Sequence, residues 1–595
     1  MCGIVGIIGK SSQVDIHLMR EEVSHRGPDD WGGYTSADGR VQFGHTRLAI
    51  LDLEHGLQPM QDQSGNYILI YNGEIFNSSK LRAQLQAEGI KFRTENSDTE
   101  VLLNGYIHFG RSFFKNINGM FSFAIYDRKK SIVVLARDHF GIKPLYYCVE
   151  KEGIRFSSEL TKSQRGIHSI DPNSISDFFT YQFIPAPHSA FQSIHKIKPG
   201  EVIEIDTQTL KCYEYSLAEE CISSKKVSGF SNEKLKEILT DSVMRWMQSD
   251  VEIAFSLSGG LDSSIIVALA ASHTNKLNTY TLGFTDIEID ERVEAKSIAE
   301  KYKTNHTEIL LTEEQLAEDI PEIISCLDEP YAGGLPSWYI YKEVGKRYKV
   351  CVTGTGGDEH FGNYQKWKAF NDPINYLRNV RRYIRNGGTF SEVFSFPISS
   401  MYTPSVFPHN QKLQGLFCED FARKVSRNNL RCLSNRLKKL GGGKYQFKNL
   451  DLTFQLSDEF LYVTDRFSMH HGVEARTPFL DQQVSSYLEK VSPGKVLNTR
   501  DYKRILKTTF DHYLTPEVLK AKKRGFILPE TSLLRKYLIN KNGIFFDEEY
   551  LNFQGIFSAQ KVKELKRKFY SNQKMFTKKL WTYIMFQLWY MSKNG

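Results

Sequence analysis

The sequence feature that most constrains this chain is the stretch 251–264, which reads Val-Glu-Ile-Ala-Phe-Ser-Leu-Ser-Gly-Gly-Leu-Asp-Ser-Ser. An apolar run with β-branched residues leads directly into the Gly-Gly pair, and a helix-prone segment, 265–271, follows at once. Glycines let backbone N–H groups converge, hydroxyl groups add donors, and the start of a helix adds its positive dipole end. The pattern therefore predicts a strand, a phosphate-binding loop and a helix.

A Gly-rich turn alone does not identify a particular kind of phosphate loop. The Lys-Ser/Thr ending of the Walker loop is missing, and no third glycine completes a dinucleotide fingerprint. Taken by itself, the pair Gly259-Gly260 is equally consistent with an ordinary Gly-Ser turn. The segment 258–264 is more specific, because it resembles the pyrophosphate loop of the N-type ATP pyrophosphatases. Those enzymes adenylate a carboxylate or carbonyl group and release pyrophosphate.

The length and composition indicate a globular protein of more than one domain. A chain of 595 residues is too long for a single core. Its hydrophobic content of 41% and charged content of 25% are ordinary for a soluble protein. The sequence shows neither an apolar run long enough to span a membrane nor a signal-peptide pattern, so we expect no membrane span and a cytoplasmic location. The eight cysteines lack metal-ligand pair spacing and are expected to be reduced.

Cys2 is the cysteine with a chemical interpretation of its own. Removal of Met1 beside so small a residue would make Cys2 the N-terminus. An α-amino group has a pKa near 8, so part of it is an unprotonated base next to the thiol that it could activate. The plainer alternative is a reduced cysteine at the start of an apolar strand.

Four downstream segments favour the catalytic interpretation of Cys2. They are 25–30 (His-Arg-Gly-Pro-Asp-Asp), 44–52 (Gly-His-Thr-Arg-Leu-Ala-Ile-Leu-Asp), 71–77 (Tyr-Asn-Gly-Glu-Ile-Phe-Asn) and 97–100 (Ser-Asp-Thr-Glu). Together with Cys2 they resemble the class II glutamine amidotransferase domain. That domain is an N-terminal nucleophile hydrolase that liberates ammonia from glutamine.

The resemblance assigns roles in the first domain. Cys2 is the nucleophile and N-terminal base, and Asn72 with the Gly73 N–H forms the oxyanion hole. Glutamine would be bound by Arg47, Leu48, Ala49, Ile50, Leu51, Asn72, Gly73, Glu74 and Asp98. The Arg47 guanidinium suits the α-carboxylate of glutamine, while Glu74 and Asp98 suit its α-ammonium group. Taken singly, Asn72-Gly73 is also a hairpin-turn signal, and Arg47 or Asp98 could be a solvated charge.

The order of predicted elements indicates two domains of α/β and α+β class. Strand-like segments such as 121–127 and 132–135 predict a two-layer, β-rich N-terminal nucleophile hydrolase sandwich over 1–215. A polar linker, 216–232, separates it from 233–595. Strands and helices then alternate from 233 onward, which predicts a doubly wound parallel-sheet ATP pyrophosphatase domain with its ligands at the C-terminal strand ends.

A second Gly-rich loop follows the predicted strand 349–353, and both loops would face one nucleotide. Asp262 and Asp358 are the acids we assign to Mg²⁺, because Mg²⁺ prefers one or two carboxylates plus phosphate oxygens. The complete predicted ATP site is Leu257, Ser258, Gly259, Gly260, Asp262, Ser263, Ser264, Leu282, Thr353 and Gly354. Of these, Leu257, Leu282, Thr353 and Gly354 are assigned to adenine and ribose by the resemblance alone.

The stretch 462–481 closely resembles a segment of the asparagine synthetases. His470, His471 and Glu474 within it could suggest a metal site, but the family match carries no metal there. Lys503 and Lys523 match lysines of the family's C-terminal region, where cations would neutralise the departing pyrophosphate. The whole chain thus resembles the glutamine-hydrolysing asparagine synthetases of the B type. The resemblance implies ATP, Mg²⁺, glutamine and a carboxylate acceptor. The family is often dimeric, which makes a homodimer possible, but the sequence alone does not determine the oligomeric state.

Two departures from the family pattern fall where the acceptor should bind. Thr355 stands where the family usually has an acid, and Gly333-Gly334 replaces an acid and a serine. A lost carboxylate leaves a cationic group of the acceptor without its partner, which is enough to change specificity. Aspartate is the default acceptor. A uronic acid sugar of a surface polysaccharide is the alternative, and a regulatory protein with a degenerate synthetase site is the third interpretation.

The net charge of +8 comes from one region. The segment 375–449 contains fourteen Lys or Arg against three acids, so the rest of the chain is slightly acidic. We interpret this basic insertion, at about 370–450, as a solvated helical region rather than a docking surface for an anionic partner. A nucleic acid partner is not expected, because no base-stacking module accompanies the charge.

Overall fold

The computed structural model describes most of the chain. The described residues are 2–10, 14–53, 56–165, 168–217, 230–285, 291–362, 415–426, 445–491, 501–521, 528–571 and 573–594, with 374, 377–378, 381, 433 and 496. Lys523, most of the basic insertion and most of the predicted linker therefore lie outside the described residues. The domain boundary at 216–232 accordingly stays a prediction.

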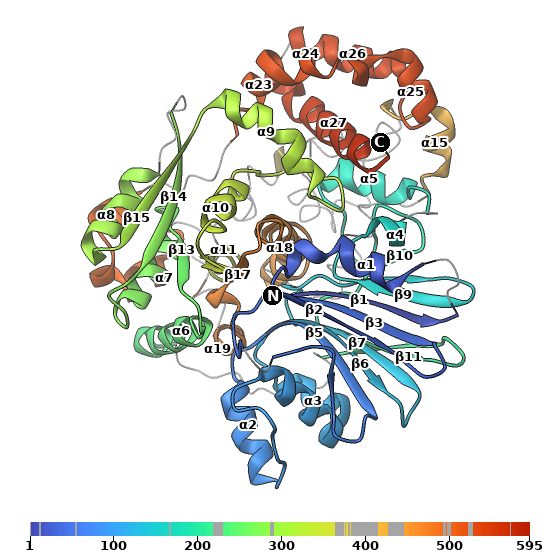
Figure 1. Ribbon diagram of the computed structural model, residues 1–595. Helices are drawn as coiled ribbons and strands as arrows, with labels where there is room; N and C mark the ends of the chain where they lie inside the picture. Colours follow the sequence, from blue (N-terminus) through green and yellow to red (C-terminus); the bar gives the residue numbers. More distant parts are fainter. Residues whose placement is uncertain are drawn as a thin grey trace.

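Two antiparallel six-stranded sheets form the N-terminal domain and lie face to face (Figure 1). The first sheet runs in the order β10 (Ile194–Lys196), β8 (Tyr146–Val149), β9 (Gly153–Ser157), β1 (Cys2–Gly9), β3 (Val41–Arg47) and β2 (Asp30–Thr35). The second runs β12 (Cys212–Ser216), β11 (Glu201–Asp206), β7 (Ile132–Arg137), β6 (Gly119–Asp127), β5 (Tyr67–Ile75) and β4 (Met60–Gln61). This arrangement confirms the predicted sandwich.

Apolar residues from both sheets fill the space between them. Ile4 and Phe43 of the first sheet pack with Ile70 and Leu135 of the second, and all four are completely buried. Burying large aliphatic and aromatic side chains stabilises the sandwich by roughly 1.5–3 kcal/mol for each side chain. The helices of this domain are α1 (Ile16–Glu22), α2 (Ser78–Ala87), α3 (Asp98–Phe109), α4 (Lys162–Arg165) and α5 (Pro172–Tyr181).

A parallel five-stranded sheet forms the centre of the second domain. Its order is β15 (Asn305–Leu311), β14 (Asn278–Phe284), β13 (Ile253–Ser256), β16 (Val350–Val352) and β17 (Glu474–Arg476). The chain winds outward from β13 in one direction and then returns to β16 on its other side. The doubly wound fold is therefore confirmed, with its topological switch point between β13 and β16, where ligands bind in folds of this class.

Helices surround this sheet and continue to the C-terminus (Figure 1). They are α6 (Asn232–Trp246), α7 (Leu261–Ala271), α8 (Arg292–Tyr302), α9 (Glu313–Ser325), α10 (Ser337–Val344), α11 (Gly357–Phe361), α15 (Glu419–Lys424), α17 (Tyr445–Leu450), α18 (Leu461–His470), α19 (Gln482–Lys490), α21 (Arg504–Thr509), α22 (Pro516–Lys520), α23 (Glu530–Leu533), α24 (Ile539–Lys541), α25 (Glu548–Gln554), α26 (Ala559–Ser571) and α27 (Gln573–Asn594). Across the part of the chain that is described, none of them combines the length and the apolar character needed to cross a membrane.

The helix after the phosphate loop begins earlier than the apolar pattern indicates. α7 starts at Leu261 rather than near Ile265, because Gly260 has the extended backbone of an N-cap residue, with φ −71° and ψ 158°. Asp262, Ser263 and Ser264 therefore belong to the first helical turn. Their positions place polar groups at the positive end of the helix dipole.

The two domains share one apolar core. Phe178 and Phe179 of α5 pack with Phe586 of α27. The ring centroid of Phe586 lies 6.1 Å from that of Phe178 and 5.6 Å from that of Phe179.

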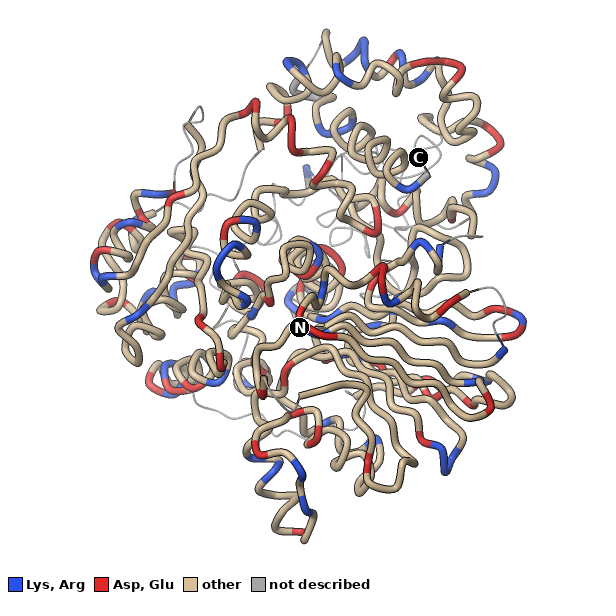
Figure 2. The backbone as a smooth tube through the Cα atoms, in the orientation of Figure 1, with Lys and Arg blue, Asp and Glu red and all other residues tan. Residues whose placement is uncertain are grey.

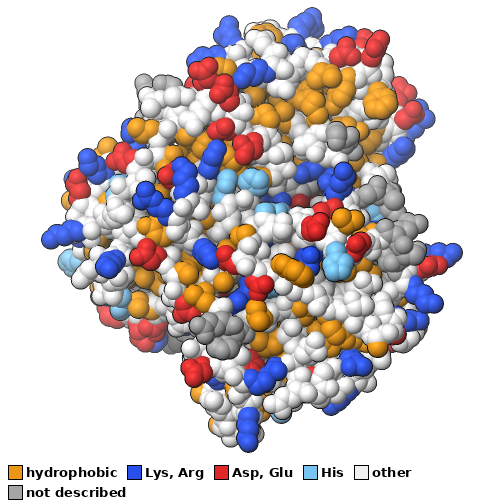
Figure 3. Space-filling view, viewed as in Figure 1, with side chains coloured by type: hydrophobic (Ala, Val, Ile, Leu, Met, Phe, Trp, Pro, Cys, Tyr) orange, Lys and Arg blue, Asp and Glu red, His pale blue; other side chains and the backbone are white. Residues whose placement is uncertain are grey.

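Acidic and basic residues are mixed along the backbone of both domains (Figure 2). The visible face is a mosaic of charged and apolar side chains (Figure 3). The chain terminus marked N lies beside α18 and β17, so the start of β1 faces the second domain (Figure 1).

Candidate active site

Cys2 opens β1 at the contact between the two sheets. Its backbone nitrogen, which becomes the α-amino group once Met1 is removed, donates a hydrogen bond to Asn72 Oδ1 at 3.0 Å. Burial raises the pKa of the Cys2 thiol, while the Leu48 N–H and the Arg47 charge act in the opposite direction. The predicted nucleophile and one predicted oxyanion residue are therefore neighbours.

Asn72 and Gly73 lie on β5, opposite β6. The Asn72 side-chain nitrogen lies 3.4 Å from Ser122 Oγ, so both ends of the amide are oriented. A Cβ atom at Gly73 would lie 2.1 Å from the Met120 carbonyl oxygen, which leaves no room for a side chain there. This close approach explains the glycine, and it keeps the backbone near Cys2 free of obstruction. The oxyanion role of both residues remains a prediction.

Arg47 is the cross-strand partner of Cys2, at the end of β3. Its guanidinium donates to the carbonyl oxygens of Asp52 at 2.6 Å and Leu53 at 3.1 Å, which fixes the side chain against the loop that follows the strand. In that loop Leu48 and Ile50 are buried against Val350 and Met469 of the second domain. The predicted glutamine-binding segment is thus held by contacts with both domains.

Glu74 and Asp98, the two acids predicted to bind the α-ammonium group of glutamine, are both buried. Asp98 Oδ2 accepts hydrogen bonds from Tyr71 Oη and the Ile75 N–H, both at 3.0 Å. Burial and the neighbouring Asp98 raise the pKa of Glu74 well above its usual range, and burial also raises the pKa of Asp98. An ammonium group bound between them would offset this cost of burial. The pair is therefore suited to the α-ammonium group of an amino acid.

The second domain contributes a strand to this pocket, which the sequence patterns did not reveal. Arg476 of β17 donates through Nε to Glu474 Oε1 at 2.5 Å, and its Nη2 lies 3.8 Å from Glu74 Oε2. Burial acts to raise the pKa of Glu474, but the nearby positive charges, Arg476 first among them, together outweigh it and lower that pKa to about 2. The backbone carbonyl of Arg476 also accepts from the Thr353 N–H at 2.8 Å. A single residue therefore contacts both predicted sites.

Arg26 makes a second connection between the domains. This completely buried side chain donates to the Cys2 carbonyl oxygen at 3.1 Å and to both Asp465 carboxylate oxygens on α18, at 2.8 and 3.1 Å. It also donates to Glu159 Oε1 at 2.7 Å. Arg26 lies in the 25–30 motif, but nothing in that motif indicates a partner 439 residues further along the chain.

The two Gly-rich loops of the second domain are packed together at the switch point. Gly259 has φ +75°, and the Ser258 and Ser263 hydroxyl oxygens lie 3.1 Å apart across the loop. A Cβ atom at Gly354 would lie 2.7 Å from the Ser263 backbone nitrogen, and one at Gly357 would lie 2.5 Å from Asp262 Oδ1. Only glycine allows this approach. The two loops converge as predicted, and the nucleotide-binding role of their residues stays a prediction.

Lys503 joins the two acids predicted to bind Mg²⁺. Its Nζ forms a short ion pair with Asp262 and lies 2.5 Å from Asp358 Oδ1. Burial acts to lower the pKa of Lys503, but the two carboxylates outweigh it and raise that pKa. Both carboxylates thus face one positive charge. Two carboxylates that converge on one point also fit a divalent cation.

Of the residues predicted to bind the acceptor, the structure describes Thr355, Gly333, Gly334 and Lys503 but not Lys523. The Thr355 hydroxyl oxygen lies 3.0 Å from that of Thr353, so a neutral hydroxyl pair occupies this part of the loop. Gly333 lies against the Tyr331 ring, and Gly334 borders open space. The adjacent Ala332 carbonyl accepts from the Trp581 indole at 3.1 Å. Leu257, just beyond β13, and Leu282, within the neighbouring β14, are both buried, and their predicted place near adenine and ribose stays a prediction.

These two sites define a class of protein, a glutamine-dependent ligase with an N-terminal thiol site and a paired phosphate-loop site. A family model for the glutamine amidotransferase domain matches residues 1–216, and one for asparagine synthase matches residues 234–591. The chain belongs to the asparagine synthase family. It is a glutamine-dependent, ATP-using ligase of the asparagine synthetase type.

Relatives of nearly full length support this membership. The asparagine synthetase (glutamine-hydrolyzing) 1 of Bacillus subtilis (strain 168) is 28% identical, over 99% of this chain and 96% of the relative. A Gibberella zeae protein named amidase chry2 is 27% identical, over 89% of each chain. Among solved structures, a glutamine phosphoribosylpyrophosphate amidotransferase from B. subtilis is 15% identical over 60% of this chain and 77% of that one, with a TM-score of 0.27. The last likeness is too weak to inform on function.

The contact at Gly354 yields a direct prediction. Gly354→Ala forces the second loop away from the Ser263 backbone, so AMP formation from ATP should fall by at least about tenfold while glutamine hydrolysis stays unchanged. Gly543→Ala is the matched control, because a Cβ atom at Gly543 meets no heavy atom within 4 Å. Both rates can be measured on one preparation. Equal AMP formation in the two variants would contradict the packing described here.

Proposed function

We propose that this chain hydrolyses glutamine at Cys2 and uses the ammonia to amidate a carboxylate that the second domain has activated with ATP. Arg476 carries the proposal, since its side chain contacts Glu74 in one site and its carbonyl accepts from Thr353 in the other. A protein that only bound glutamine or only bound ATP would have no need to join the two pockets.

In the first half-reaction, the Cys2 sulfur attacks the carboxamide carbon of glutamine. The α-amino group released by removal of Met1 takes the thiol proton and later gives a proton to the departing ammonia. Asn72 and the Gly73 N–H stabilise the oxyanion, and water then releases glutamate. Arg47, Glu74 and Asp98 hold the zwitterionic end of the substrate away from the reacting carbon.

Ammonia must reach the second site without meeting bulk water, because in water it is mostly ammonium and is not nucleophilic. One apolar cluster joins the two domains and includes Phe76, Met120 and Ile142 of the first domain with Trp246 and Leu480 of the second. Leu480 also lies against Gly356 of the second Gly-rich loop, since a Cβ atom built at Gly356 would be 2.5 Å from Leu480 Cδ2. We infer that this cluster lines the ammonia route, since apolar walls favour the neutral molecule.

In the second half-reaction, an acceptor carboxylate oxygen attacks the α-phosphorus of ATP, and pyrophosphate leaves. The 258–264 loop and the start of α7 hold the phosphates, and Lys503 balances the charge on the leaving pyrophosphate. Asp262 and Asp358 would hold Mg²⁺, which supplies charge neutralisation between phosphate groups. Ammonia then attacks the acyl carbon, and AMP departs.

Aspartate is the proposed acceptor by default, because full-length relatives are named asparagine synthetases. A second candidate, a carboxylate without an α-ammonium group such as a uronic acid sugar, is favoured by one observation. Thr355 and Thr353 present a neutral hydroxyl pair where an ammonium group would need an acid.

A screen of carboxylates for AMP release tests the proposal. The purified chain is incubated with ATP, Mg²⁺, glutamine and one acceptor at a time, and AMP is measured. We expect one acceptor class to stimulate AMP release at least about tenfold. Stimulation by aspartate supports the default, and stimulation by uronic acids alone supports the second candidate. If none of the carboxylates stimulates AMP release, the amidation proposal is contradicted.

A further inference from the structure

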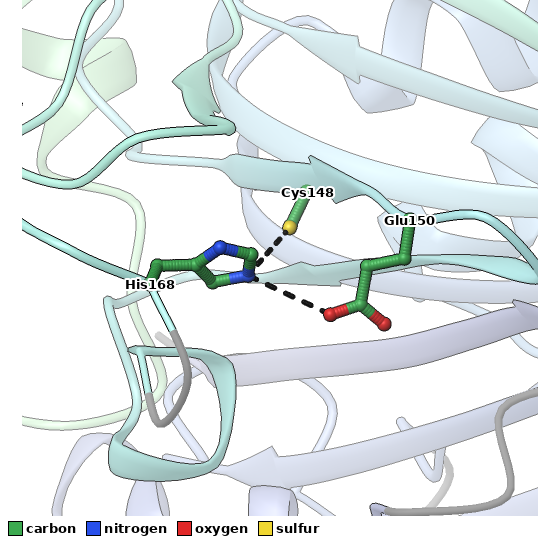
Figure 4. A group of neighbouring side chains, drawn as sticks. All are labelled: Cys148, Glu150 and His168. Carbon is green, nitrogen blue, oxygen red and sulfur yellow. Dashed lines mark hydrogen bonds and ion pairs between the residues drawn. The ribbon is translucent and has the colours of Figure 1, made fainter.

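A cluster of side chains in the N-terminal domain has no part in either site. Cys148 on β8, Glu150 just beyond it and His168 before α5 lie together, with one potential ligand atom from each within 4.8 Å of the others (Figure 4). It is the one group of this kind among the residues that the structure describes. Cys148 pairs across the sheet with Arg155, and Arg155 pairs with Ile7 of β1. Cys148 is thus two strands from the nucleophile strand, roughly 10 Å across the sheet.

From this geometry we propose that Cys148, His168 and Glu150 form a binding site for a divalent transition-metal ion of the zinc type. Thiolate sulfur, imidazole nitrogen and carboxylate oxygen are the ligand set that zinc takes in proteins. The proposal is independent of the amidation reaction and adds a site to the fold.

The distances fit such an ion. With Zn–S near 2.3 Å, Zn–N near 2.0 Å and a tetrahedral angle, the sulfur and nitrogen ligands should lie about 3.5 Å apart, and the nitrogen and oxygen about 3.3 Å apart. Cys148 Sγ lies 3.2 Å from His168 Nε2, and that nitrogen lies 3.5 Å from Glu150 Oε1. Figure 4 shows one ring nitrogen facing both the sulfur and the carboxylate. The imidazole nitrogen therefore lies close to the expected ligand spacing from both the sulfur and the carboxylate oxygen.

The surroundings are those of a structural or exchangeable site with one open position. Cys148 is buried, while His168 and Glu150 are partly exposed, so water can reach the fourth coordination position. Arg155 forms a short ion pair with Glu150 and donates to the Ser163 carbonyl at 2.8 Å. Both Arg155 and His168 face the same carboxylate oxygen, Glu150 Oε1. Because a carboxylate has two oxygens, Glu150 would have to turn so that Oε1 keeps Arg155 and Oε2 is offered to the ion.

A reactive-thiol interpretation of the same cluster is less consistent with it. Burial, and then the nearby Glu150 charge, raise the pKa of Cys148 to about 11, against the opposing effect of Arg155. Without a cation the sulfur is thus a thiol and a poor nucleophile. On binding, the thiol proton would go to solvent and the ion would take its place. The ion would fasten the β8–β9 hairpin to the segment that leads into α5.

Cobalt binding to the full-length chain tests the site, because a thiolate bound to Co²⁺ gives a charge-transfer band that oxygen ligands do not give. The chain, purified without a polyhistidine tag, is titrated with Co²⁺ and then with Zn²⁺. We expect one equivalent of Co²⁺ with the thiolate band, displaced by Zn²⁺. Cobalt held by Asp262 and Asp358 would not give this band, so the two kinds of site are distinguished.

Substitutions of Cys148, His168 and Glu150 test whether each of them binds the ion. Cys148→Ser and His168→Gln should abolish the band, and Glu150→Gln should weaken Co²⁺ binding by at least about tenfold. Cys212→Ser, at an exposed cysteine of the same domain, and Cys2→Ala should retain the band. No thiolate band in the wild-type chain at saturating Co²⁺ would overturn the proposal, and so would a band that persists in Cys148→Ser. The wild-type measurement does not depend on whether any variant folds.

Discussion

Replacing Cys2 with alanine should abolish glutamine-dependent amidation and leave ammonia-dependent amidation intact. The variant loses the thiol of the residue whose backbone nitrogen donates to Asn72, and removing a covalent nucleophile commonly lowers turnover by about 10⁴-fold or more. Alanine is small enough for Met1 removal to continue, and the backbone nitrogen keeps its bond to Asn72. Glutamate release and AMP formation, measured with glutamine and then with ammonium salt, separate the two halves.

Cys212→Ala is the matched control, because Cys212 is an exposed cysteine of the same domain. It should retain both activities. Glutamate release at the wild-type rate in Cys2→Ala would remove Cys2 from the chemistry. Loss of ammonia-dependent amidation in the same variant would show that Cys2 also serves the second domain, which this account does not allow.

Replacing Lys503 with methionine should produce the largest effect in the second domain. The methionine keeps an unbranched side chain one atom shorter than lysine but leaves Asp262 and Asp358 without the cation that now lies between them. Removing one positive group from a developing phosphate charge costs about 10²–10³-fold in rate. We expect pyrophosphate release to fall by that factor, with glutamine hydrolysis unchanged.

Lys507→Met is the control for this substitution. Lys507 lies one turn further along, is partly exposed and pairs with the exposed Asp501 at 2.9 Å. An exposed pair of this kind contributes little, so pyrophosphate release should match that of the wild type. Equal rates for Lys503→Met and Lys507→Met would contradict the role given to Lys503.

Much of the fold was predictable because local patterns determine it. The apolar run before Gly259 forms β13, 278–284 forms β14 as expected, and alternation of strands with helices led to the parallel sheet. The start of α7 differed, since a glycine N-cap extended the helix to residues that lack apolar periodicity. The predicted Mg²⁺ acids were brought together because both follow strands at the switch point.

Contacts between the domains could not be predicted in this way. Arg476 reaches Glu74, and Arg26 reaches Asp465, although hundreds of residues separate the members of each pair. Periodicity reports the face of an element that is buried, but not which distant element covers it. The Cys148 cluster lies within one domain, but the spacing of Cys148, Glu150 and His168 along the chain matches no metal-ligand motif, so the sequence does not indicate it.

The fate of the acceptor's carboxylate oxygens tests the central claim most directly. The acceptor found in the screen is labelled on its carboxylate with the heavy isotope of oxygen and turned over with ATP and glutamine, and the AMP is analysed by mass spectrometry. Activation as an acyl adenylate predicts that each AMP carries one labelled oxygen from the acceptor. Unlabelled AMP, formed at the same rate as the amide, would contradict the account.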